Sequence, residues 1–269
     1  MGGRFDSTNV IHPLVSVITS VGYDHMAQLG NTLEAIAFQK AGIIKRRTPV
    51  VSGVLEPGPA AVNAEVAREH FVPISILNRD FREVSFELSL LGRHQAKNAA
   101  LVVETITRLR EIGLTIPERA LRWGLANTDW PARIEVISQN PTIVLDSAHN
   151  EPSIAALVET LGEFLPVTGK KHLVFAVSND KPFDKMLAIL APFFDHFYFT
   201  KYGVNPRCVP PEQLADILKR IEPNRFAQHL TNSTDALHAA RMAAKPNDLV
   251  CITGSFFLAG ELRPHLIEN

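Results

Sequence analysis

The sequence has little cysteine and no excess of charge of either sign. Its 269 residues include two cysteines, Cys208 and Cys251, which give neither a disulfide framework nor a metal-binding spacing. We therefore expect reduced thiols in a cytoplasmic protein. The 27 basic and 28 acidic residues leave a formal net charge of −1, so no basic field favours nucleic acid or an anionic membrane.

Long hydrophobic runs and a phosphate-binding loop are also missing. Apolar stretches such as 186–191 and 249–253 are far too short to cross a bilayer. The Gly169-Lys170 pair lacks both the earlier glycine and the following serine or threonine of a Walker A loop. No Gly-x-Ser-x-Gly motif marks an activated serine, so a hydrolase of that kind is poorly supported.

The first half of the chain alternates between strand-like and helix-like segments. Hydrophobic content of 46% fits a folded domain with a substantial core. Asn31 with Glu34 resembles a capping box, and Gly42 stands where that helix is expected to end. Such alternation favours a mostly parallel sheet. We predict strands at 15–21, 49–52, 72–77 and 84–91, and helices at 31–40, 57–69, 95–112 and 117–123.

The second half restarts the same alternation after Trp130-Pro131, where the proline favours an extended segment. The sequence therefore predicts an α/β protein with two domains, 1–130 and 131–269. We predict strands at 133–137, 142–146, 172–177, 194–199 and 249–253, and helices at 152–164, 182–191, 211–220, 234–243 and 256–262.

The segment 143–150 is the most informative stretch, because a buried strand ends in Asp146, His149 and Asn150. In α/β sheets such strand ends open into ligand-binding crevices. Arg133 could clamp a phosphate, while Asp146 could accept from ribose hydroxyls and His149 could contact a base. Alternatively, Asp146 caps the next helix and pairs with Arg133 as a structural bridge. The residues alone favour neither interpretation.

Further polar residues follow strands or stand at helix ends. His25 could bind a metal through a neutral ring nitrogen or merely hydrogen-bond a turn. Lys40 complements the dipole of a helix end. Asn98 stands in a helix start that could hold a polar ligand, although ordinary capping explains it as well. The turn ending at Ser255 suits a carboxylate or phosphate but is weakly specific.

Taken together, these segments resemble the folylpolyglutamate synthase and dihydrofolate synthase family, within the Mur ligase superfamily. The resemblance implies an incomplete Mur-ligase-type ATP-binding domain over 1–130 and a Rossmann-like glutamate-ligase domain over 131–269. The matching stretches occur in family order and cover nearly the whole chain: 2–9, 15–25 with 29–30, 40–44, 92–95 with Asn98, 130–133, 145–150 and 253–255.

The resemblance also implies a reaction. ATP phosphorylates a carboxylate of a pterin-containing acceptor, dihydropteroate or folate, and the amine of L-glutamate then attacks the acyl phosphate. Mg²⁺ and cationic side chains stabilise the transferring phosphoryl group. These small molecules are the expected partners, with no nucleic acid or membrane, and the full-length protein is expected to be a monomer.

The resemblance also implies roles for individual residues, according to the family positions that they match. His25 matches a magnesium ligand, and Lys40 matches a catalytic lysine that CO2 carbamylates, which makes it a metal-binding carboxylate. His149, the second catalytic candidate, lies close to the nucleotide. The remaining matches are Asn98, Arg133 and Asp146 to ATP contacts, Phe5, Asp6 and Ser7 to a pterin-contacting loop, and Ser255 to the glutamate side.

The sequence departs from the family pattern near its start. The family's glycine-rich phosphate loop, a magnesium-binding serine and a metal-binding glutamate should precede Gly2. A smaller departure is Ser147, where the family usually has glycine. We therefore hypothesise a truncated ligase that is inactive as this chain. The alternatives are a non-catalytic remnant that binds nucleotide or glutamate, and another Mur-type amide ligase.

Overall fold

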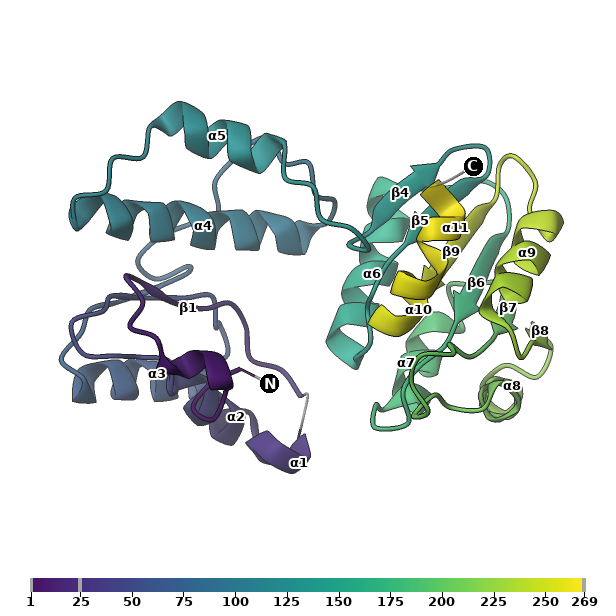
Figure 1. Ribbon diagram of the computed structural model, residues 1–269, viewed down its shortest axis with the longest axis horizontal. Coiled ribbons are helices and arrows are strands. Elements are labelled where there is room, and N and C mark those ends of the chain that lie inside the picture. The colour runs from purple at the N-terminus through teal and green to yellow at the C-terminus, as the bar shows by residue number, and fades with distance from the viewer. Residues whose placement is uncertain (1, 24–25, 268–269) are drawn as a thin grey trace. The chain divides into compact units, whose positions relative to one another are not determined.

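The computed structural model describes residues 2–23 and 26–267 and has the α/β architecture that the sequence predicts (Figure 1). The chain divides into two compact units. Unit 1 comprises residues 1–89 and 93–128, and unit 2 comprises residues 90–92 and 129–269. The division near residue 129 lies beside Trp130-Pro131, where the sequence predicts a boundary.

Unit 1 is built on a three-stranded parallel sheet in the order β1-β2-β3. Apolar residues of this sheet and of the first helices form its core, which includes Ile18, Ile36, Val50 and Val66. The strands are β1 (Ser16–Ile18), β2 (Val50–Ser52) and β3 (Ile74–Ile76), and the helices are η1 (Ser7–Val10), α1 (Met26–Leu29), α2 (Leu33–Ala41), α3 (Pro57–Glu69), α4 (Arg93–Glu111) and α5 (Glu118–Ala126).

Helix α2 begins and ends for reasons other than those predicted. Thr32 is its N-cap, and the Thr32 hydroxyl accepts a hydrogen bond from the Ala35 amide. The predicted capping box of Asn31 and Glu34 is therefore wrong. Gly42 does end the helix, but in a right-handed conformation with φ −61°. Glycine is needed there for space, because a Cβ would lie 2.5 Å from Cβ of Arg4.

The predicted strand at 84–91 is also wrong. Its residues alternate between half-buried and exposed, as in a strand, but no strand in the described part of the chain pairs with them. The Ser89 amide instead donates to the carbonyl of Leu125 at 3.2 Å, and the Phe86 ring lies 4.6 Å from the Arg122 guanidinium. Packing against α5 therefore satisfies the alternating pattern without sheet hydrogen bonds.

Unit 2 contains a six-stranded sheet in the order β4-β5-β9-β6-β7-β8. All neighbours are parallel except the β4–β5 pair, which is antiparallel. Strand β8 was not predicted from sequence, because its four residues are all exposed and form no apolar run. The strands are β4 (Glu135–Ser138), β5 (Thr142–Leu145), β6 (Lys171–Phe175), β7 (His196–Phe199), β8 (Phe226–His229) and β9 (Leu249–Thr253).

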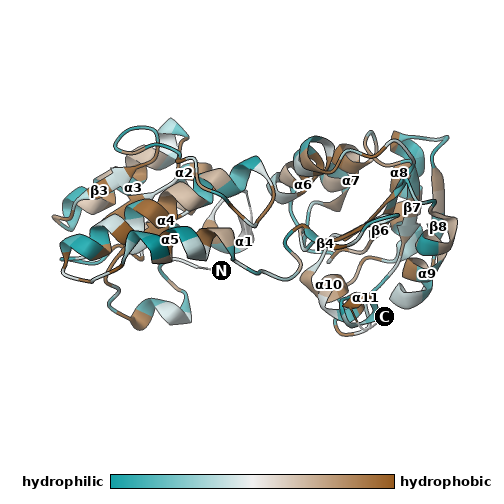
Figure 2. Cartoon of the chain, turned by 90° about the horizontal axis from the view of Figure 1, so that it is seen from above, coloured by the Kyte–Doolittle hydropathy of each residue, from teal (hydrophilic) through white to brown (hydrophobic). Residues whose placement is uncertain are grey.

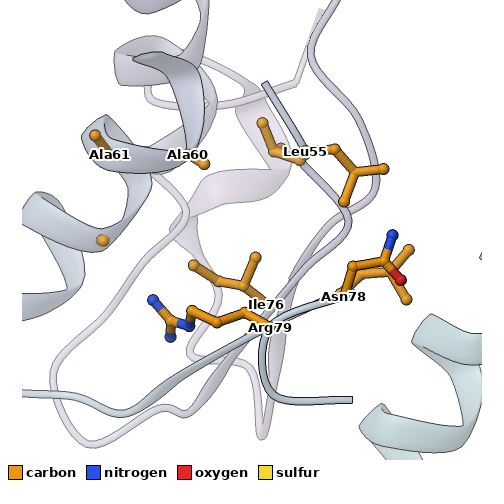
Figure 3. A pocket seen from close by; sticks show the side chains of 9 residues that line it. Leu55, Ala60, Ala61, Ile76, Asn78 and Arg79 are labelled. Atoms are coloured by element: carbon orange, nitrogen blue, oxygen red, sulfur yellow. The ribbon is translucent and has the colours of Figure 1, made fainter. Parts of the chain in front are cut away.

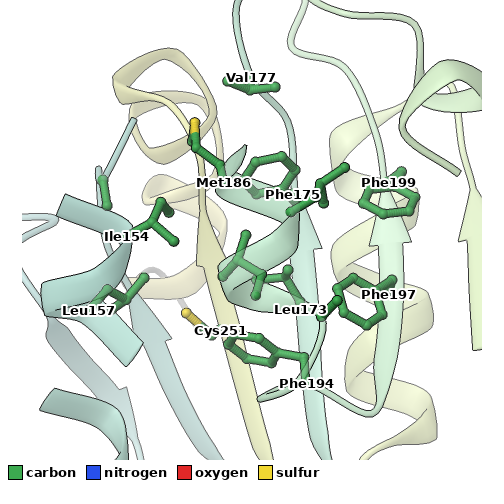
Figure 4. Packing of buried hydrophobic residues seen from close by; sticks show 14 of the residues in the cluster. Ile154, Leu157, Leu173, Phe175, Val177, Met186, Phe194, Phe197, Phe199 and Cys251 are labelled. Carbon is green, nitrogen blue, oxygen red and sulfur yellow. The ribbon is translucent and has the colours of Figure 1, made fainter. Parts of the chain in front are cut away.

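Helices cover both faces of this sheet, as in a doubly wound fold. Helices α6 (Glu151–Phe164), α7 (Phe183–Leu190) and α8 (Pro211–Ile221) pack on one face, in the cluster shown in part in Figure 4. Helices α9 (Ser233–Ala243), α10 (Phe256–Leu262) and α11 (Pro264–Ile267) contribute to the cluster on the other face. Brown, apolar segments run through this sheet in Figure 2.

Helix α6 shows how the sequence specifies this packing. Asn150 is its N-cap and forms a reciprocal capping box with Ser153. Ile154, Leu157 and Leu161 follow helical spacing, and each is at most 1% exposed. In Figure 4, Ile154 and Leu157 point toward the sheet. The sequence pattern that predicts this helix therefore also places Asn150 and the preceding loop at the carboxyl end of β5.

Two of the sequence predictions concern the cysteine thiols and membrane-spanning segments. Cys208 and Cys251 are both free thiols, and burial raises the pKa of each. Among the described residues, none of the helices combines the length and the apolar character that spanning a bilayer requires.

Candidate functional site

The carboxyl ends of β5 and β9 form the centre of the candidate site in unit 2. The two strands are parallel neighbours, yet the helix after β5 packs on one face of the sheet and the helix after β9 on the other. In doubly wound sheets, ligands bind at strand ends where the chain segments diverge in this way. Asp146 follows β5 directly, and Ser255 follows β9 after Gly254.

Asp146 is held by backbone amides from the segment before β4 and from the loop after β5. Its Oδ1 accepts from the Ala148 amide at 2.7 Å, and its Oδ2 accepts from the Ile134 amide at 3.0 Å. The Thr253 hydroxyl lies 3.4 Å from Oδ1. Because Asp146 is only 4% exposed, burial raises its pKa, although these amides and the charge of Arg133 act in the opposite direction.

Arg133 is exposed on a backbone with two unusual residues. Ala132 and Ile134, which flank it, have φ of 55° and 49°. Left-handed conformations are uncommon for residues other than glycine, especially for β-branched ones, and each costs on the order of 1–3 kcal/mol. The Asp146 carboxylate stabilises the Ile134 amide, and the Glu135 carboxylate accepts from the Ala132 amide at 2.8 Å.

His149 lies beside an exposed aromatic side chain. Its Nδ1 is 2.9 Å from the carbonyl oxygen of Ser147. Since a carbonyl can only accept, Nδ1 is the donor in this contact. The ring centroid lies 4.9 Å from that of Phe256, which is 58% exposed. Together these rings offer a half-exposed aromatic surface suited to a planar ligand.

The loop after β9 brings Ser255 to the same edge. The Ala148 carbonyl accepts from the Gly254 amide at 3.0 Å, which joins this loop to the loop after β5. Gly254 has φ 108°, and a Cβ there would lie 2.4 Å from the Ala176 carbonyl oxygen. Ser255 is 4% exposed and caps α10 by accepting from the Phe257 amide. Because of this clash and the positive φ, only glycine fits at position 254, directly before Ser255.

Two buried side chains near Ser255 were missed from sequence. Tyr202 is 2% exposed, and its hydroxyl lies 2.6 Å from the Ser178 hydroxyl, with Ser255 as a further hydrogen-bonding neighbour. Burial raises the pKa of Tyr202. No motif marks these residues, because they come from the ends of separate strands that only the sheet order brings together. Unit 2 therefore brings together Asp146, His149 and Ser255, with Arg133 beside them.

In unit 1 the loop that contains Phe5, Asp6 and Ser7 lies against the end of α2. The Arg4 amide donates to the Gln39 carbonyl at 2.7 Å. Asp6 caps η1 by accepting from the Thr8 amide and also from the Gly2 amide at 2.8 Å. Hydrogen bonds from Thr8 and Gly2 hold the pKa of Asp6 well below its usual range.

The side chains next to Asp6 face outward. Phe5 is 78% exposed, and Ser7 is also exposed. Neither residue is buried against its own unit, which leaves both side chains accessible to a ligand.

Lys40 and Asn98 lie on helices of the same unit, but no described contact joins them. Lys40 is half-buried in the last turn of α2, next to Gln39, whose side-chain oxygen is buried without a hydrogen-bond partner. Asn98 is exposed on α4 and donates to Gln95 at 2.9 Å. The predicted magnesium ligand His25 lies outside the described residues.

Within the part of the chain that the structure describes, no three His, Cys, Asp or Glu side chains come together as a metal-binding group. A pocket of about 490 Å³ does open in unit 1, beside α3 and the ends of β2 and β3. Figure 3 shows Ala60 and Ala61 of α3 on one side of it and Ile76, Asn78 and Arg79 on another. None of the side chains predicted for the site lines this pocket.

Comparison with known proteins identifies the family. A family model for the Mur ligase glutamate ligase domain matches residues 132–256, which includes the whole edge described in unit 2. A dihydrofolate synthase/folylpolyglutamate synthase of Bacillus subtilis is 33% identical over 288 residues, and the match covers 99% of this chain and 66% of that protein. The chain belongs to the folylpolyglutamate synthase and dihydrofolate synthase family.

Solved structures of the family have the same fold. A Mycobacterium tuberculosis folylpolyglutamate synthase complexed with ADP is 31% identical, with a TM-score of 0.90 over 99% of this chain and 66% of the other. A bifunctional enzyme with Mn, AMPPNP and L-glutamate bound is 27% identical, with a TM-score of 0.83 over 98% and 65%. The chain thus spans just under two thirds of the length of the relatives it matches.

Proposed function

We propose that the chain carries the chemistry of an ATP-dependent ligase that adds L-glutamate to dihydropteroate, to a folate, or to both. One observation carries the proposal: Asp146, His149, Ser255 and Arg133 meet at the strand ends of unit 2. A matched glutamate ligase domain covers all of these residues. The relatives' names, dihydrofolate synthase and folylpolyglutamate synthase, indicate the acceptor. AMPPNP, an ATP analogue, and L-glutamate are bound to one relative and stand for the other two substrates.

In the proposed reaction a carboxylate oxygen of the acceptor attacks the γ-phosphorus of ATP, and ADP leaves. The amine nitrogen of L-glutamate then attacks the carbonyl carbon of the acyl phosphate. It loses a proton as the amide forms and inorganic phosphate departs. Arg133 contacts nucleotide phosphate, since a guanidinium suits phosphate geometry and this one is exposed.

The other residues of this edge bind rather than react. The aromatic surface of His149 and Phe256 receives the base. Asp146 keeps the loops after β5 and before β4 in place, and Ser255 lies on the side where L-glutamate enters. This assignment makes His149 a contact of the nucleotide through its ring.

Unit 1 supplies the acceptor side in this proposal. The exposed Phe5 and Ser7 contact the pterin, with Asp6 holding their loop. Asn98 is a further nucleotide contact. Lys40, once its amine had added CO2 and lost a proton to give a carbamate, would hold Mg²⁺ with His25, and the ion would neutralise charge on the transferring phosphoryl group. The described residues contain no ready-made group of three metal ligands, so no step is derived through the ion. We further propose a cytoplasmic monomer for the full-length protein.

The first test is ADP binding to this chain, measured by titration calorimetry with wild type, Arg133→Ala and Lys170→Ala. Lys170 is a matched control because its cation pairs with Asp195 at 3.3 Å, beyond the amino end of β6. We expect Arg133→Ala to weaken ADP binding about tenfold, a loss of about 1.4 kcal/mol, and Lys170→Ala to leave it unchanged. Equal affinities for wild type and Arg133→Ala would remove Arg133 from the nucleotide site.

A second assay separates the competing functions. ADP release that requires both L-glutamate and a reduced folate or dihydropteroate supports the proposed ligase. ADP and L-glutamate binding without turnover, even with the family's phosphate-loop segment restored, supports the binding-module alternative. Turnover with a cell-wall precursor, and none with folates, supports a different Mur-type amide ligase.

A further inference from the structure

The backbone around Arg133 is held by two carboxylates from different strand ends. Glu135, the first residue of β4, accepts from the Ala132 amide at 2.8 Å. Asp146, the residue after β5, accepts from the Ile134 amide at 3.0 Å. Both amides belong to residues with positive φ. Without these acceptors the two residues would favour ordinary right-handed or extended conformations, and Arg133 would be presented in a different direction.

Glu135 is itself fixed by an arginine from the other end of unit 2. Arg263 follows α10 and donates from Nε to both Glu135 oxygens at 3.1 and 3.0 Å, and from Nη2 to Oε1 at 2.8 Å. The paired side chains are 31% and 18% exposed. This fork-like geometry fixes the orientation of the carboxylate more firmly than a single contact does.

The pair thereby joins the two sides of the candidate site. Helix α10 begins after Ser255, and Arg263 is its C-cap, with its amide bonded to the Ala259 carbonyl at 2.9 Å. A continuous set of contacts therefore runs from the glutamate side of the edge, through α10 and Arg263, to Glu135 and the amide before Arg133. No sequence motif marks Glu135 or Arg263, which are 128 positions apart in the chain.

We propose that Glu135 and Arg263 are positioning residues that hold the guanidinium of Arg133 toward the phosphates of a bound adenine nucleotide. This proposal rests on the proposed function. Neither side chain contacts the nucleotide in it. Glu135 acts through the Ala132 amide, and Arg263 acts through Glu135.

The test combines amide hydrogen exchange with ADP titration on the whole chain. Glu135→Ala removes the acceptor of the Ala132 amide, and Arg263→Ala removes the side chain that orients it. We expect each variant to speed exchange of the Ala132 amide at least tenfold in the ligand-free chain and to weaken ADP binding three- to tenfold. Arg263→Lys keeps the charge and should recover part of both effects, because one ammonium contact to Glu135 remains possible.

Lys170→Ala is the matched control, since it removes an ion pair of the same unit beyond the amino end of β6. It should change neither readout. A merely structural ion pair predicts a lower unfolding free energy with unchanged ADP affinity in the folded protein, and that result would overturn the proposal. Unchanged exchange at Ala132 in Glu135→Ala would also overturn it.

Arg133→Ala distinguishes failure of the positioning role from failure of the proposed nucleotide site. If Arg133→Ala weakens ADP binding and Glu135→Ala does not, the positioning role fails while the proposed function stands. If Arg133→Ala also leaves ADP binding unchanged, the positioning role fails together with the proposed nucleotide contact of Arg133. If both variants weaken binding and Arg133→Ala/Glu135→Ala together lose no more than Arg133→Ala alone, Glu135 acts through Arg133 as proposed.

Discussion

The candidate residues of unit 2 are anchored, whereas those of unit 1 are mostly exposed. Asp146 and Ser255 are each 4% exposed and use their oxygens to hold neighbouring backbone. Phe5 is 78% exposed, and Asn98 is also exposed. Unit 2 can therefore build its part of a site from its own contacts, while the geometry of the unit 1 residues depends more on whatever binds them.

The two sheets explain this contrast. In unit 2, β9 has a strand on each side and helices on both faces, so its end is fixed from all directions. In unit 1 the sheet has three short strands, and β1 lies at its edge. Apolar side chains of the segment before β1 and of α2 remain exposed: Phe5, Val10, Ile11, Leu14 and Phe38.

Gly254→Ala should give the largest effect. The new Cβ would lie 2.4 Å from the Ala176 carbonyl oxygen on a backbone with φ 108°, directly after the central strand β9. We expect unit 2 to lose at least about 4 kcal/mol of unfolding free energy. Urea unfolding followed by Trp130 fluorescence, in a Trp123→Phe background, measures this loss.

Gly260→Ala is the control for that experiment. Gly260 lies within α10 with no atom near its added Cβ, so the substitution should stabilise the unit by about 0.5–1 kcal/mol. A small loss in Gly254→Ala would mean that the strand end is less constrained than its contacts indicate.

Asp146→Asn should have the next largest effect. Asparagine has one acceptor oxygen, whereas Asp146 accepts from the Ala148 and Ile134 amides through different oxygens. One buried amide would then face an NH2 group, at a cost of roughly 1–3 kcal/mol. Asp6→Asn in unit 1 is the matched change, because Asp6 also accepts from two amides through different oxygens. It should cost less, since these contacts are exposed and water can hydrogen-bond the amide that asparagine leaves unpaired. Similar losses for both variants would contradict the contrast between units.

Gly3→Ala tests the same contrast from the unit 1 side. A Cβ there would lie 2.3 Å from the Gln39 carbonyl oxygen, with φ 89°, so the clash resembles that at Gly254. The loop can detach locally, however, which limits the loss to about 1 kcal/mol. Exchange of the Arg4 amide, bonded to Gln39, should become much faster. Gly2→Ala has positive φ but no clash and should leave that amide protected.

The sequence predicts the helices and strands better than it predicts the contacts that hold the candidate site. Apolar spacing locates α6 and the ends of β5 and β9, because burial of these residues requires that pattern. It cannot predict the left-handed Ala132 and Ile134 or the Glu135–Arg263 pair, since these depend on contacts between distant segments. The strand at 84–91 fails for a related reason: alternation indicates a half-buried extended segment, whereas a strand also needs a partner.

The Glu135–Arg263 ion pair gives the smallest predicted effect, and this effect depends on pH. Arg263 holds the pKa of Glu135 below its usual range. The pair therefore contributes fully above the unfolded pKa of about 4.3 and is lost as pH falls through the lower folded pKa. Because both side chains are partly exposed, screening limits the contribution to about 1 kcal/mol. The difference in unfolding free energy between wild type and Glu135→Gln should be constant from pH 7 to 5 and shrink in more acid solution.

Asp146 should behave in the opposite way, because burial raises its pKa. Its protonation is favoured by folding, so its contribution to stability is present below the unfolded pKa and is lost as pH rises through the folded pKa. The difference in unfolding free energy between wild type and Asp146→Asn should therefore grow as the pH falls, whereas that between wild type and Glu135→Gln shrinks. Urea unfolding at a series of pH values measures both differences. If both shrank together in acid, Asp146 would be held in the folded protein as a carboxylate, like Glu135.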